Sequence, residues 1–374
     1  MEQTPQRFST LDVFRGLTVF IMIVVNTPGS GAVPYAPLLH AGWHGCTLTD
    51  LVFPSFLFAI GNAMPFAQKK WQDKSDTYIL SKILKRTVLL FFVGHLLTWY
   101  TSMHFVNGRI AFVPFAQTRI LAVLQRIALC YGAAALLVHY FTPRRVVVIS
   151  IFFLLLYWVL LYAFGASGAA YTIEGNFVRK IDLAVLSAPH MYREGGIVFD
   201  PEGLLSTLPA IVNVTAGYLA ACFILKKGKT RDGVVTLLLA GAVLITFGLV
   251  WQYWFPFNKK LWTSSYVLYT TGIDLVVLAF LFYAIELKKW KRCVFFFSVL
   301  GKNPLAVYVL SNLLLFVFIL NITPDKIFID WINEIAFQKL APGPLGSLLF
   351  ALCFTLLCWL AAWLMDKQKI YVRL

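Results

Sequence analysis

Residues 145–163 read RVVVISIFFLLLYWVLLYA, a single arginine followed by eighteen uncharged residues, and this stretch decides the fold class. A helix that crosses the hydrocarbon core of a bilayer needs roughly 20 mostly apolar residues. Nine similar stretches flank it, at residues 11–27, 50–68, 83–102, 119–140, 204–225, 233–252, 262–285, 295–320 and 344–365. The sequence therefore predicts an all-α polytopic membrane protein with about ten transmembrane helices and no separate soluble domain.

The composition of the 374 residues agrees with this prediction. Hydrophobic residues make up 59% of the chain and charged residues only 13%, whereas soluble domains are about 45–50% apolar and about 25% charged. The formal net charge of +15 is typical of a membrane protein whose basic loops face the anionic cytoplasmic leaflet. We therefore expect the lipid bilayer, and no nucleic acid, among the partners.

The distribution of basic residues predicts the orientation. The tails and alternate loops on one side carry eighteen Lys and Arg residues, and the longer loops on the other side carry eight. Because basic loops stay in the cytoplasm, we expect a multi-pass protein of the cell (inner) membrane with both termini cytoplasmic. The first span is read as an uncleaved helix rather than a signal peptide. Residues 1–374 then form a single transmembrane domain with extracytoplasmic loops at about 28–49 and 164–203.

The six cysteines give no sign of a metal site or a disulfide scaffold. The sequence contains no CxxC pair and no cluster of His and Cys, so we expect no metal. Cys46 is the one cysteine in a long polar loop, and its neighbours suggest a small filler there. The second long loop, at 164–203, is too short to build a core alone, so we expect it to pack over the membrane domain.

Several charged residues lie inside apolar stretches, where insertion of a charge near the bilayer centre costs about 2.5–3.5 kcal/mol. Asp12 and Arg15 are three residues apart and can pair on one helix face, or Arg15 can bind an anionic ligand. Arg119 is read as an anchor at the extracytoplasmic end of its helix. Arg126 lies two turns deeper, and either binds a ligand or ties helices together.

Two further positions are open to two interpretations each. Lys302 and Asn303 follow Gly301 and precede Pro304, which indicates a broken helix. The exposed backbone N–H groups of such a break suit a phosphate, but a simple kink explains the pattern equally well. Asp274 is either a hydrogen-bond partner between helices or a group that contacts substrate.

The polar loop after the first span carries the strongest chemical signal. His40 lies in a short loop between Asn26 and Asp50, so all three residues emerge at one membrane face. Imidazole accepts and returns a proton near neutrality, a carboxylate can orient the ring, and an amide can stabilise a developing oxyanion. These are the groups that acyl transfer needs. His44 has no such neighbours and reads as a solvated loop histidine.

A series of motifs in order along the chain resembles a known family. They are LDVFRGL (11–17), VN (25–26), HAGWHGCTLTDLVFP (40–54), VLQR (123–126), DPEGLL (200–205), LWTSSYV (261–267) and GKNPLAVYV (301–309). Together they are similar to the heparan-alpha-glucosaminide N-acetyltransferase family and its bacterial relatives, the transmembrane glucosamine N-acetyltransferases. The resemblance runs from about residue 8 to the last helix.

The resemblance implies a ten-helix membrane domain that draws acetyl-CoA from the cytoplasm and passes its acetyl group to a glucosamine amine on the far side. The active-site histidine of the family falls on His40 and its asparagine on Asn26. The lysosomal members have asparagine where this chain has His44. They also carry an N-terminal luminal domain outside these 374 residues, so we expect a free amino sugar or a short glucosamine-ended saccharide as acceptor, and a possible homodimer.

The working hypothesis assigns roles to eleven residues. We expect catalysis by His40, Asn26 and Asp50. We expect the phosphates of acetyl-CoA to be held by Arg15, Arg126, Lys302 and Asn303, and the acceptor to be bound by Trp43, His44, Asp274 and Glu202. Two alternatives share many of these features: a transporter of amino sugars or anions, and an O-acyltransferase that modifies a hydroxyl of a wall polymer.

Overall fold

The computed structural model describes residues 8–29, 34–71, 73–106, 109–319, 321–323 and 326–372. Its long helices are α1 (Ser9–Asn26), α2 (Leu48–Lys69), α3 (Asp76–Thr101), α4 (Val123–Tyr140), α5 (Pro143–Phe164), α7 (Thr207–Lys227), α8 (Arg231–Trp251), α9 (Ser264–Phe282), α11 (Pro304–Ile319) and α14 (Pro344–Lys367). Short helices are α6 (Phe177–Leu186), α10 (Val294–Lys302), α12 (Phe328–Ile332) and α13 (Gln338–Leu340).

Three antiparallel hairpins and five short turns complete the described structure. The hairpins pair β1 (His104–Val106) with β2 (Arg109–Ala111), β3 (Arg193–Glu194) with β4 (Ile197–Val198), and β5 (Asn321–Thr323) with β6 (Lys326–Ile327). The turns are the 3-10 segments η1 (Ala36–Leu38), η2 (Phe115–Gln117) and η3 (Ala188–His190), and the π-helical segments η4 (Tyr283–Leu287) and η5 (Asn333–Phe337).

The all-α polytopic class predicted from the sequence is confirmed. Within the described residues, eight helices are long and apolar enough to cross a membrane, and nine if α10 and α11 form one span. The helix predicted at 83–102 is present as α3, which carries Lys85 and Arg86 and is not among those nine. Each of the ten predicted stretches thus contains a helix, but length and composition support eight or nine spans rather than ten.

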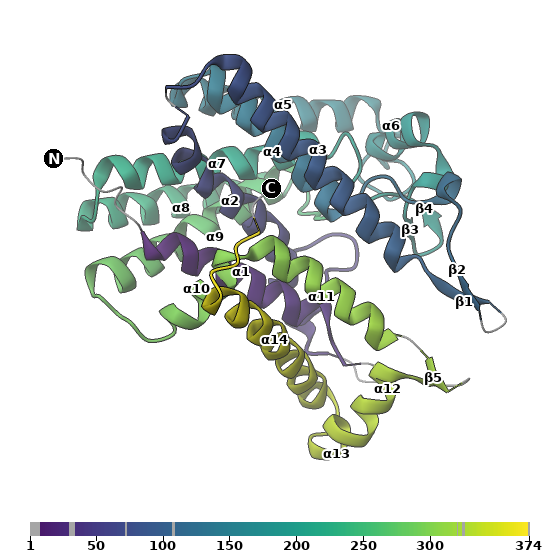
Figure 1. Ribbon diagram of the computed structural model, residues 1–374. Coiled ribbons are helices and arrows are strands. Elements are labelled where there is room, and N and C mark those ends of the chain that lie inside the picture. Colours follow the sequence, from purple (N-terminus) through teal and green to yellow (C-terminus); the bar gives the residue numbers. More distant parts are fainter. Residues whose placement is uncertain are drawn as a thin grey trace.

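Helix α1 lies in the middle of the bundle (Figure 1), where it contacts α2, α9, α10, α11 and α14. Small residues let the central helices approach closely, as is common in membrane proteins. A Cβ added to Gly16 would lie 1.7 Å from the carbonyl oxygen of Phe297 on α10. Between α2 and α7, a Cβ on Gly61 would lie 1.9 Å from the carbonyl oxygen of Val214. Neither helix pair has room for a side chain at these contacts.

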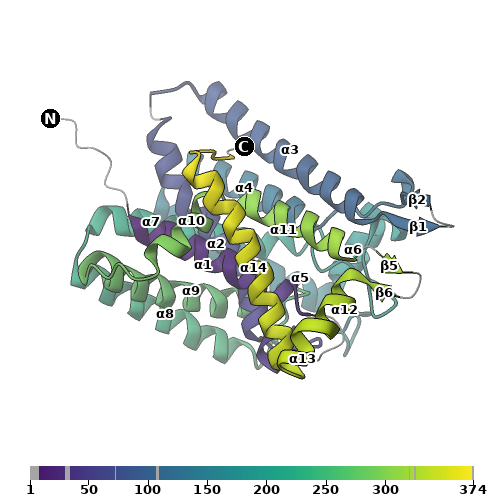
Figure 2. The same cartoon turned by 60° about the horizontal axis from the view of Figure 1, so that its bottom comes forward.

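The short elements gather at one end of the bundle. Figures 1 and 2 both show β1–β2, β5, α6 and α12 at this end, while α3 runs along the outside, away from α8 and α9. The loop that holds His40 connects α1 to the start of α2, and the segment 252–263 connects α8 to α9. Hydrogen bonds between these two loops and segment 164–203 build the candidate site.

The ninth predicted span is broken, as the sequence indicated. Helices α10 and α11 are bent by 83° at Asn303, which precedes Pro304. Proline has no backbone N–H and disfavours helical geometry in the residue before it, so the break follows from the local sequence.

Several boundaries differ from the prediction by a few residues, and one of these differences moves a charged residue out of a helix. Helix α4 begins at Val123 rather than at residue 119, because Ala122 before it is extended. Arg119 therefore lies in the loop before the helix, where it binds two carboxylates, and its placement within the fourth span was wrong.

Candidate active site

The start of α2 fixes the loop that carries His40. Asp50 is the third residue of the helix and forms a capping box with Thr47, so its carboxylate satisfies backbone N–H groups that the helix leaves open. Asp50 Oδ2 accepts hydrogen bonds from the backbone N–H groups of Thr47 and Ala41, both at 3.0 Å. The carboxylate thus folds residues 41–47 back over the first turn and holds His40 beside it.

The second oxygen of the same carboxylate contacts the histidine. His40 Nδ1 lies 2.7 Å from Asp50 Oδ1, and the histidine side chain is 45% exposed while that of the aspartate is 1% exposed. An ionised carboxylate only accepts hydrogen bonds, so Nδ1 donates and the lone pair of neutral His40 sits on Nε2. A buried carboxylate that orients an accessible imidazole is the pairing that the sequence predicted for these two residues.

A lysine that the sequence analysis did not single out completes this cluster. Lys259 Nζ lies 3.2 Å from His40 Nδ1 and 3.3 Å from His40 Nε2. Burial lowers the pKa of Lys259, although the charges of Glu202 and Asp50 act in the opposite direction. Lys259 lies two residues before the LWTSSYV motif, and that closeness was the only signal in the sequence.

The next residue fastens the two loops together. Lys260 Nζ donates to the backbone oxygen of Gly42 at 2.7 Å and pairs with Glu194 of the β3–β4 hairpin at 2.8 Å. The backbone N–H of Gly45 donates to the oxygen of Phe257 at 2.8 Å. The histidine loop is therefore held by the α8–α9 connection and by segment 164–203, which packs over it.

Trp43 and His44 are neighbours in this loop but have different partners. The indole N–H of Trp43 donates to the backbone oxygen of Tyr171 at 2.8 Å, and its ring meets Phe199 edge-on at 5.3 Å. His44 is exposed, and its Nδ1 lies 3.5 Å from Asn258 Nδ2. Trp43 thus anchors the loop, while His44 faces solvent beside the site.

Asn26 is placed at the same end of the bundle but is not joined to the histidine. It is the last residue of α1 and is exposed. In the part of the chain that the structure describes, its side chain forms no hydrogen bond with His40 or Asp50. The amide is therefore available to a ligand at the mouth of the bundle.

A network of charges lies beside Lys259. Arg119 binds Asp200 through Nε at 3.0 Å and Nη2 at 2.6 Å, and also contacts Glu202 Oε2 at 2.5 Å. Arg119, Arg126 and Lys259 lower the pKa of Glu202 against its burial, which acts to raise it. The motif DPEGLL is thus held by Arg119, and Glu202 stays ionised within electrostatic reach of Lys259.

Arg126 is fully buried on the first turns of α4. Its Nη2 donates to the backbone oxygen of Gly203 at 2.9 Å and to the hydroxyl of Ser206, and its guanidinium lies 5.1 Å from the ring centre of Trp262. Within the described residues, its Nε and Nη1 have no hydrogen-bond partner. Both interpretations of Arg126 find support, since it ties α4 to α7 and keeps donors free.

The same motif contacts a buried acid in α6. Asp182 Oδ1 accepts from the backbone N–H of Leu204 at 2.8 Å, and a Cβ on Gly203 would lie 1.8 Å from Asp182 Oδ2. Burial raises the pKa of Asp182 to about 7. The side chain is fully buried, so its protonation state affects how segment 164–203 packs.

The residues expected to hold cofactor phosphates do not form one site. Lys302 pairs with Asp366 at 2.7 Å. Asn303 donates to the backbone oxygen of Ile370 at 2.8 Å and accepts from the N–H of Val372 at 3.0 Å. These contacts fasten the C-terminal segment to the broken helix, and they occupy the groups that a phosphate would need.

Arg15 has a weaker set of contacts. Its Nη1 donates to the backbone oxygen of Gly301 at 2.9 Å and lies 3.8 Å from Asp12 Oδ1. This agrees with a pair on one helix face. Arg86 on α3 lies within electrostatic range of Arg15, a proximity that no pattern in the sequence indicated.

Asp274 lies apart from the histidine cluster. Its Oδ1 accepts a hydrogen bond of 2.5 Å from Ser55 on α2, and the side chain is buried on α9. This geometry is that of a partner between two helices rather than a group that contacts an acceptor.

The thiol of Cys46 in the histidine loop favours its protonated form. Burial raises the pKa of Cys46 to about 12, and a nucleophilic cysteine needs a thiolate. The structure thus agrees with Cys46 as a small filler.

Taken together, the helices define a polytopic membrane protein, and one end of its bundle carries an oriented imidazole with a neighbouring ammonium group. A family model described as "Heparan-alpha-glucosaminide N-acetyltransferase, catalytic" matches residues 7–179, which include Asn26, His40 and Asp50. The resemblance seen in the sequence is confirmed: over residues 7–179 the chain is similar to the heparan-alpha-glucosaminide N-acetyltransferase family.

Two curated relatives extend the match beyond residue 179. Human heparan-alpha-glucosaminide N-acetyltransferase is 26% identical over 361 residues, which cover 82% of this chain and 52% of the human protein. The mouse protein is 25% identical over 359 residues, covering 81% of this chain and 53% of the relative. The chain thus spans about half the length of the curated relatives that it matches.

Proposed function

We propose that the protein is a transmembrane N-acetyltransferase that moves acetyl from acetyl-CoA to the amine of glucosamine or of a glucosamine-ended saccharide. The observation that carries this proposal is the 2.7 Å contact between His40 and buried Asp50. It gives a general base of defined tautomer at an accessible end of a membrane bundle. The names of the human and mouse relatives support the same activity.

In the direct route, His40 acts as the base. The amine nitrogen attacks the thioester carbonyl carbon and forms the C–N bond, while Nε2 accepts the amine proton. The C–S bond then breaks, and the proton on Nε2 passes to the departing thiolate, which leaves as the CoA thiol. Asp50 stabilises the imidazolium that exists between these steps. Neutral His40 is regenerated, so one residue serves as base and then as acid.

We assign two donors to the stabilisation of negative charge on the carbonyl oxygen. The amide of Asn26 is exposed, and the ammonium of Lys259 lies 3.3 Å from His40 Nε2. Charged donors aimed at a developing oxyanion act strongly in a partly dry site. Lys259 must move from its contact with Nε2 when the amine arrives, and Glu202 offers it a second counter-charge.

A two-step route uses the same groups. His40 Nε2 attacks the thioester carbonyl carbon, the C–S bond breaks, and CoA leaves as the thiolate. The amine then attacks the acetyl-imidazolium, the bond to Nε2 breaks, and the proton that the amine loses neutralises the thiolate through solvent. Exchange of labelled CoA into acetyl-CoA without any acceptor distinguishes this route, because direct transfer gives no exchange.

The acceptor is proposed to bind between the histidine loop and segment 164–203. Exposed His44 belongs to the same loop as His40, and Glu202 lies within electrostatic range of Lys259. Trp43 is half-buried, and we assign the exposed part of its ring to contact with the sugar. We propose that this end of the bundle faces the outside of the cell (inner) membrane, with both termini and the acetyl-CoA supply in the cytoplasm. The excess of Lys and Arg in the two tails and in the loops on the opposite side supports that orientation.

The test uses the full chain purified in detergent, with labelled acetyl-CoA and glucosamine. Changing His40→Ala should lower turnover by roughly 100-fold or more, since general bases contribute about 10²–10⁴-fold. The matched variant His44→Ala, in the same loop, should chiefly raise KM for the sugar. Near-normal turnover by His40→Ala protein would refute the assignment. An enzyme consumes acetyl-CoA in detergent solution, whereas a transporter needs two compartments. Testing a panel of amines and alcohols as acceptors distinguishes N-acetyl transfer from O-acetyl transfer.

A further inference from the structure

Two loops at the end of α9 farthest from Lys259 carry a dense group of positive charges. Residues 226–231, between α7 and α8, read KKGKTR, and residues 288–292, between η4 and α10, read KKWKR. All eight Lys and Arg residues are exposed. We call these two loops the basic platform. The carboxylates nearest to them in the sequence are Asp232 and Glu286, so the platform keeps a large excess of positive charge.

One buried carboxylate fastens the two loops to each other. Glu286 Oε2 lies 2.6 Å from Lys229 Nζ, and Glu286 Oε1 accepts hydrogen bonds from the backbone N–H and the hydroxyl of Thr10 at 3.3 and 3.1 Å. The Lys229 ammonium also lies 5.5 Å from the ring centre of Phe8. Figures 1 and 2 both show the turn between α7 and α8 beside the start of α1. Because like charges repel, this fastening holds the cations closer together than two free loops would.

The second loop of the basic platform is a compact turn. The backbone N–H of Trp290 donates to the oxygen of Ala284 at 2.9 Å, which folds the chain back onto η4. Lys289 and Cys293 adopt positive φ angles of 52° and 62°. Residues with a Cβ rarely adopt this left-handed conformation, and they keep it only where the surrounding structure enforces it. The turn therefore presents the cations of residues 288–292 in a fixed arrangement.

Exposed apolar side chains adjoin the basic platform. Trp290 is 50% exposed and Phe295 is 57% exposed. On α8, exposed apolar residues begin one turn after Arg231, at Val235 and Leu239. Because α8 is long and apolar enough to cross a membrane, this apolar face lies in lipid and its first turn lies at the depth of the headgroups. Cations beside a tryptophan at this depth are typical of contact with lipid headgroups.

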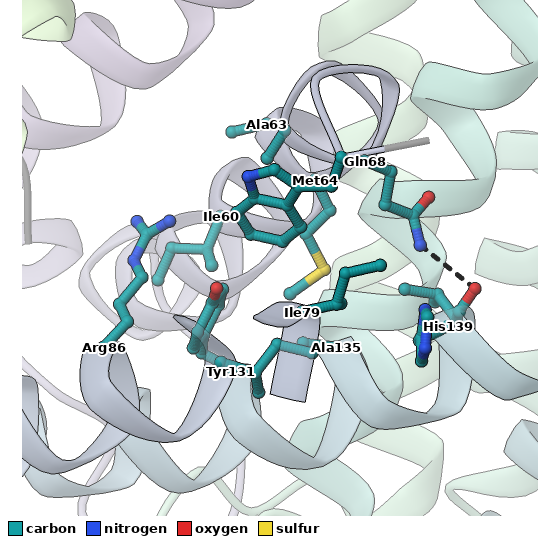
Figure 3. A pocket seen from close by; sticks show the side chains of 13 residues that line it. Ile60, Ala63, Met64, Gln68, Ile79, Arg86, Tyr131, Ala135 and His139 are labelled. Atoms are coloured by element: carbon teal, nitrogen blue, oxygen red, sulfur yellow. Dashed lines mark hydrogen bonds between the residues drawn. The ribbon is translucent and has the colours of Figure 1, made fainter. Parts of the chain in front are cut away.

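The basic platform is separate from a cavity of about 290 Å³ among α2, α3 and α4, which Figure 3 shows from close by. The residues that line the cavity fall between Ile60 and His139, and both loops of the platform lie outside that range. A ligand of the platform is therefore distinct from a ligand of the cavity.

We propose that the basic platform binds the headgroups of anionic phospholipids, with the cations of residues 288–292 as phosphate ligands and Trp290 at the membrane interface. A Lys or Arg near an anionic membrane surface contributes about fivefold in affinity, and the headgroup phosphates supply counter-charge to the exposed cations. Bound lipid holds the turn between α7 and α8 and the turn before α10 at the membrane surface. This role goes beyond the proposed function, since it does not depend on acetyl transfer.

The test measures binding of fluorescent phosphatidylglycerol to the purified full chain in a neutral detergent, with phosphatidylcholine, which has no net charge, as the reference. The unaltered protein should prefer phosphatidylglycerol by about tenfold or more. Its affinity for this lipid should fall by about tenfold or more in a quadruple variant of the second loop, which combines Lys288→Gln, Lys289→Gln, Lys291→Gln and Arg292→Gln.

The matched control removes the same charge from segment 69–82, where Asp73 and Asp76 offset part of the positive charge. This control should change the affinity for phosphatidylglycerol less than about threefold; it combines Lys69→Gln, Lys70→Gln, Lys74→Gln and Lys82→Gln. All eight substituted residues are exposed, so both variants should unfold at the same temperature as the unaltered protein when no lipid is added. Equal losses of affinity in the two variants would overturn the inference, because binding would then follow net charge alone.

A single variant tests the fixed arrangement of the two loops. Glu286→Gln adds one positive charge to the protein but removes the ion pair with Lys229, so it should weaken binding of phosphatidylglycerol by about threefold. Tighter binding by this variant would overturn the inference. So would equal affinity of the unaltered protein for the two lipids, or displacement of phosphatidylglycerol by an equal concentration of inorganic phosphate, because the ligand would then be a soluble anion rather than a headgroup.

Discussion

Replacing Asp50 by asparagine reverses the proton arrangement of His40. Asp50 Oδ2 accepts from the backbone N–H groups of Ala41 and Thr47, both at 3.0 Å. An asparagine must keep its single oxygen at that position, because its NH₂ group would otherwise face two donors. The NH₂ then points at His40 Nδ1, which must accept. The proton of the neutral ring moves to Nε2, and the base loses the lone pair that receives the amine proton.

The expected magnitude follows from this geometry. General base catalysis contributes about 10²–10⁴-fold, so Asp50→Asn should lower kcat by roughly 100-fold or more. The backbone hydrogen bonds to position 50 survive, and stability should change by no more than the worth of a helix cap, about 0.5–2 kcal/mol. Thr47→Val is the matched control. It removes the hydroxyl that lies 3.0 Å from Asp50 Oδ2 and weakens the cap, but it leaves the His40–Asp50 contact in place and should keep kcat within threefold.

The assay is steady-state acetyl transfer combined with thermal unfolding in detergent, for each single variant and for Asp50→Asn with His40→Ala. If Asp50 acts through His40, the double variant is no slower than His40→Ala alone, since residues that act as a unit are not additive. Multiplying losses in the double variant would refute the tautomer argument. So would an Asp50→Asn protein of normal kcat and lowered thermal stability, because Asp50 would then be only a helix cap.

Three other predictions concern different parts of the structure. Lys259→Met should lower kcat by about 100-fold through loss of oxyanion stabilisation, while Lys260→Met, which removes only the loop contact, should lower it far less; equal effects in transfer assays would contradict this. Gly61→Ala places a Cβ 1.9 Å from the backbone oxygen of Val214 and should destabilise the α2–α7 contact by about 1–3 kcal/mol, seen as a lower unfolding temperature; an unchanged temperature would contradict the packing argument. Asp182 has a folded-state pKa of about 7 against an ordinary value of 3.8, so the folded state binds the proton more tightly. Stability should therefore be greatest below pH 4 and fall by at most about 4 kcal/mol as pH rises to 7 and above. Asp182→Asn should flatten that dependence, and an unaltered pH profile of thermal unfolding would count against it.

The positions of the helices were predictable because their signal is local. Each apolar stretch contains a helix, and Pro304 after Asn303 predicts the break in the ninth. The same reasoning fails at Arg119, because the apolar count begins before the chain turns helical at Val123. Only its ion pair with Asp200 and Glu202, more than eighty residues away, shows why that segment stays extended.

The candidate site was predictable in part for a similar reason. His40 and Asp50 are ten residues apart in a loop whose ends are fixed by two helices, so their contact follows from short-range geometry. Lys259 comes from a loop more than two hundred residues later, and a pair of lysines before an apolar stretch looks like any interfacial charge. Lys302 shows the opposite error, a residue that the sequence assigned to a site and that the structure places elsewhere. Its position after a glycine in a broken helix suggests a phosphate ligand, but the C-terminal segment folds back and Asp366 occupies it.

Helix α2 joins the histidine site to the middle of the bundle. Asp50 at its first turn needs an ordered, tightly packed loop, since a base displaced by even an ångström loses much of its effect. Gly61 lies about three turns further along the helix, where close contact with α7 holds α2 in place. A substitution at Gly61 that shifts α2 should therefore lower turnover as well as stability, whereas Asp50→Asn should act chiefly on turnover. Measuring thermal unfolding and acetyl transfer for both variants tests whether the packing of α2 supports the base, and normal turnover by a destabilised Gly61→Ala protein would show that it does not.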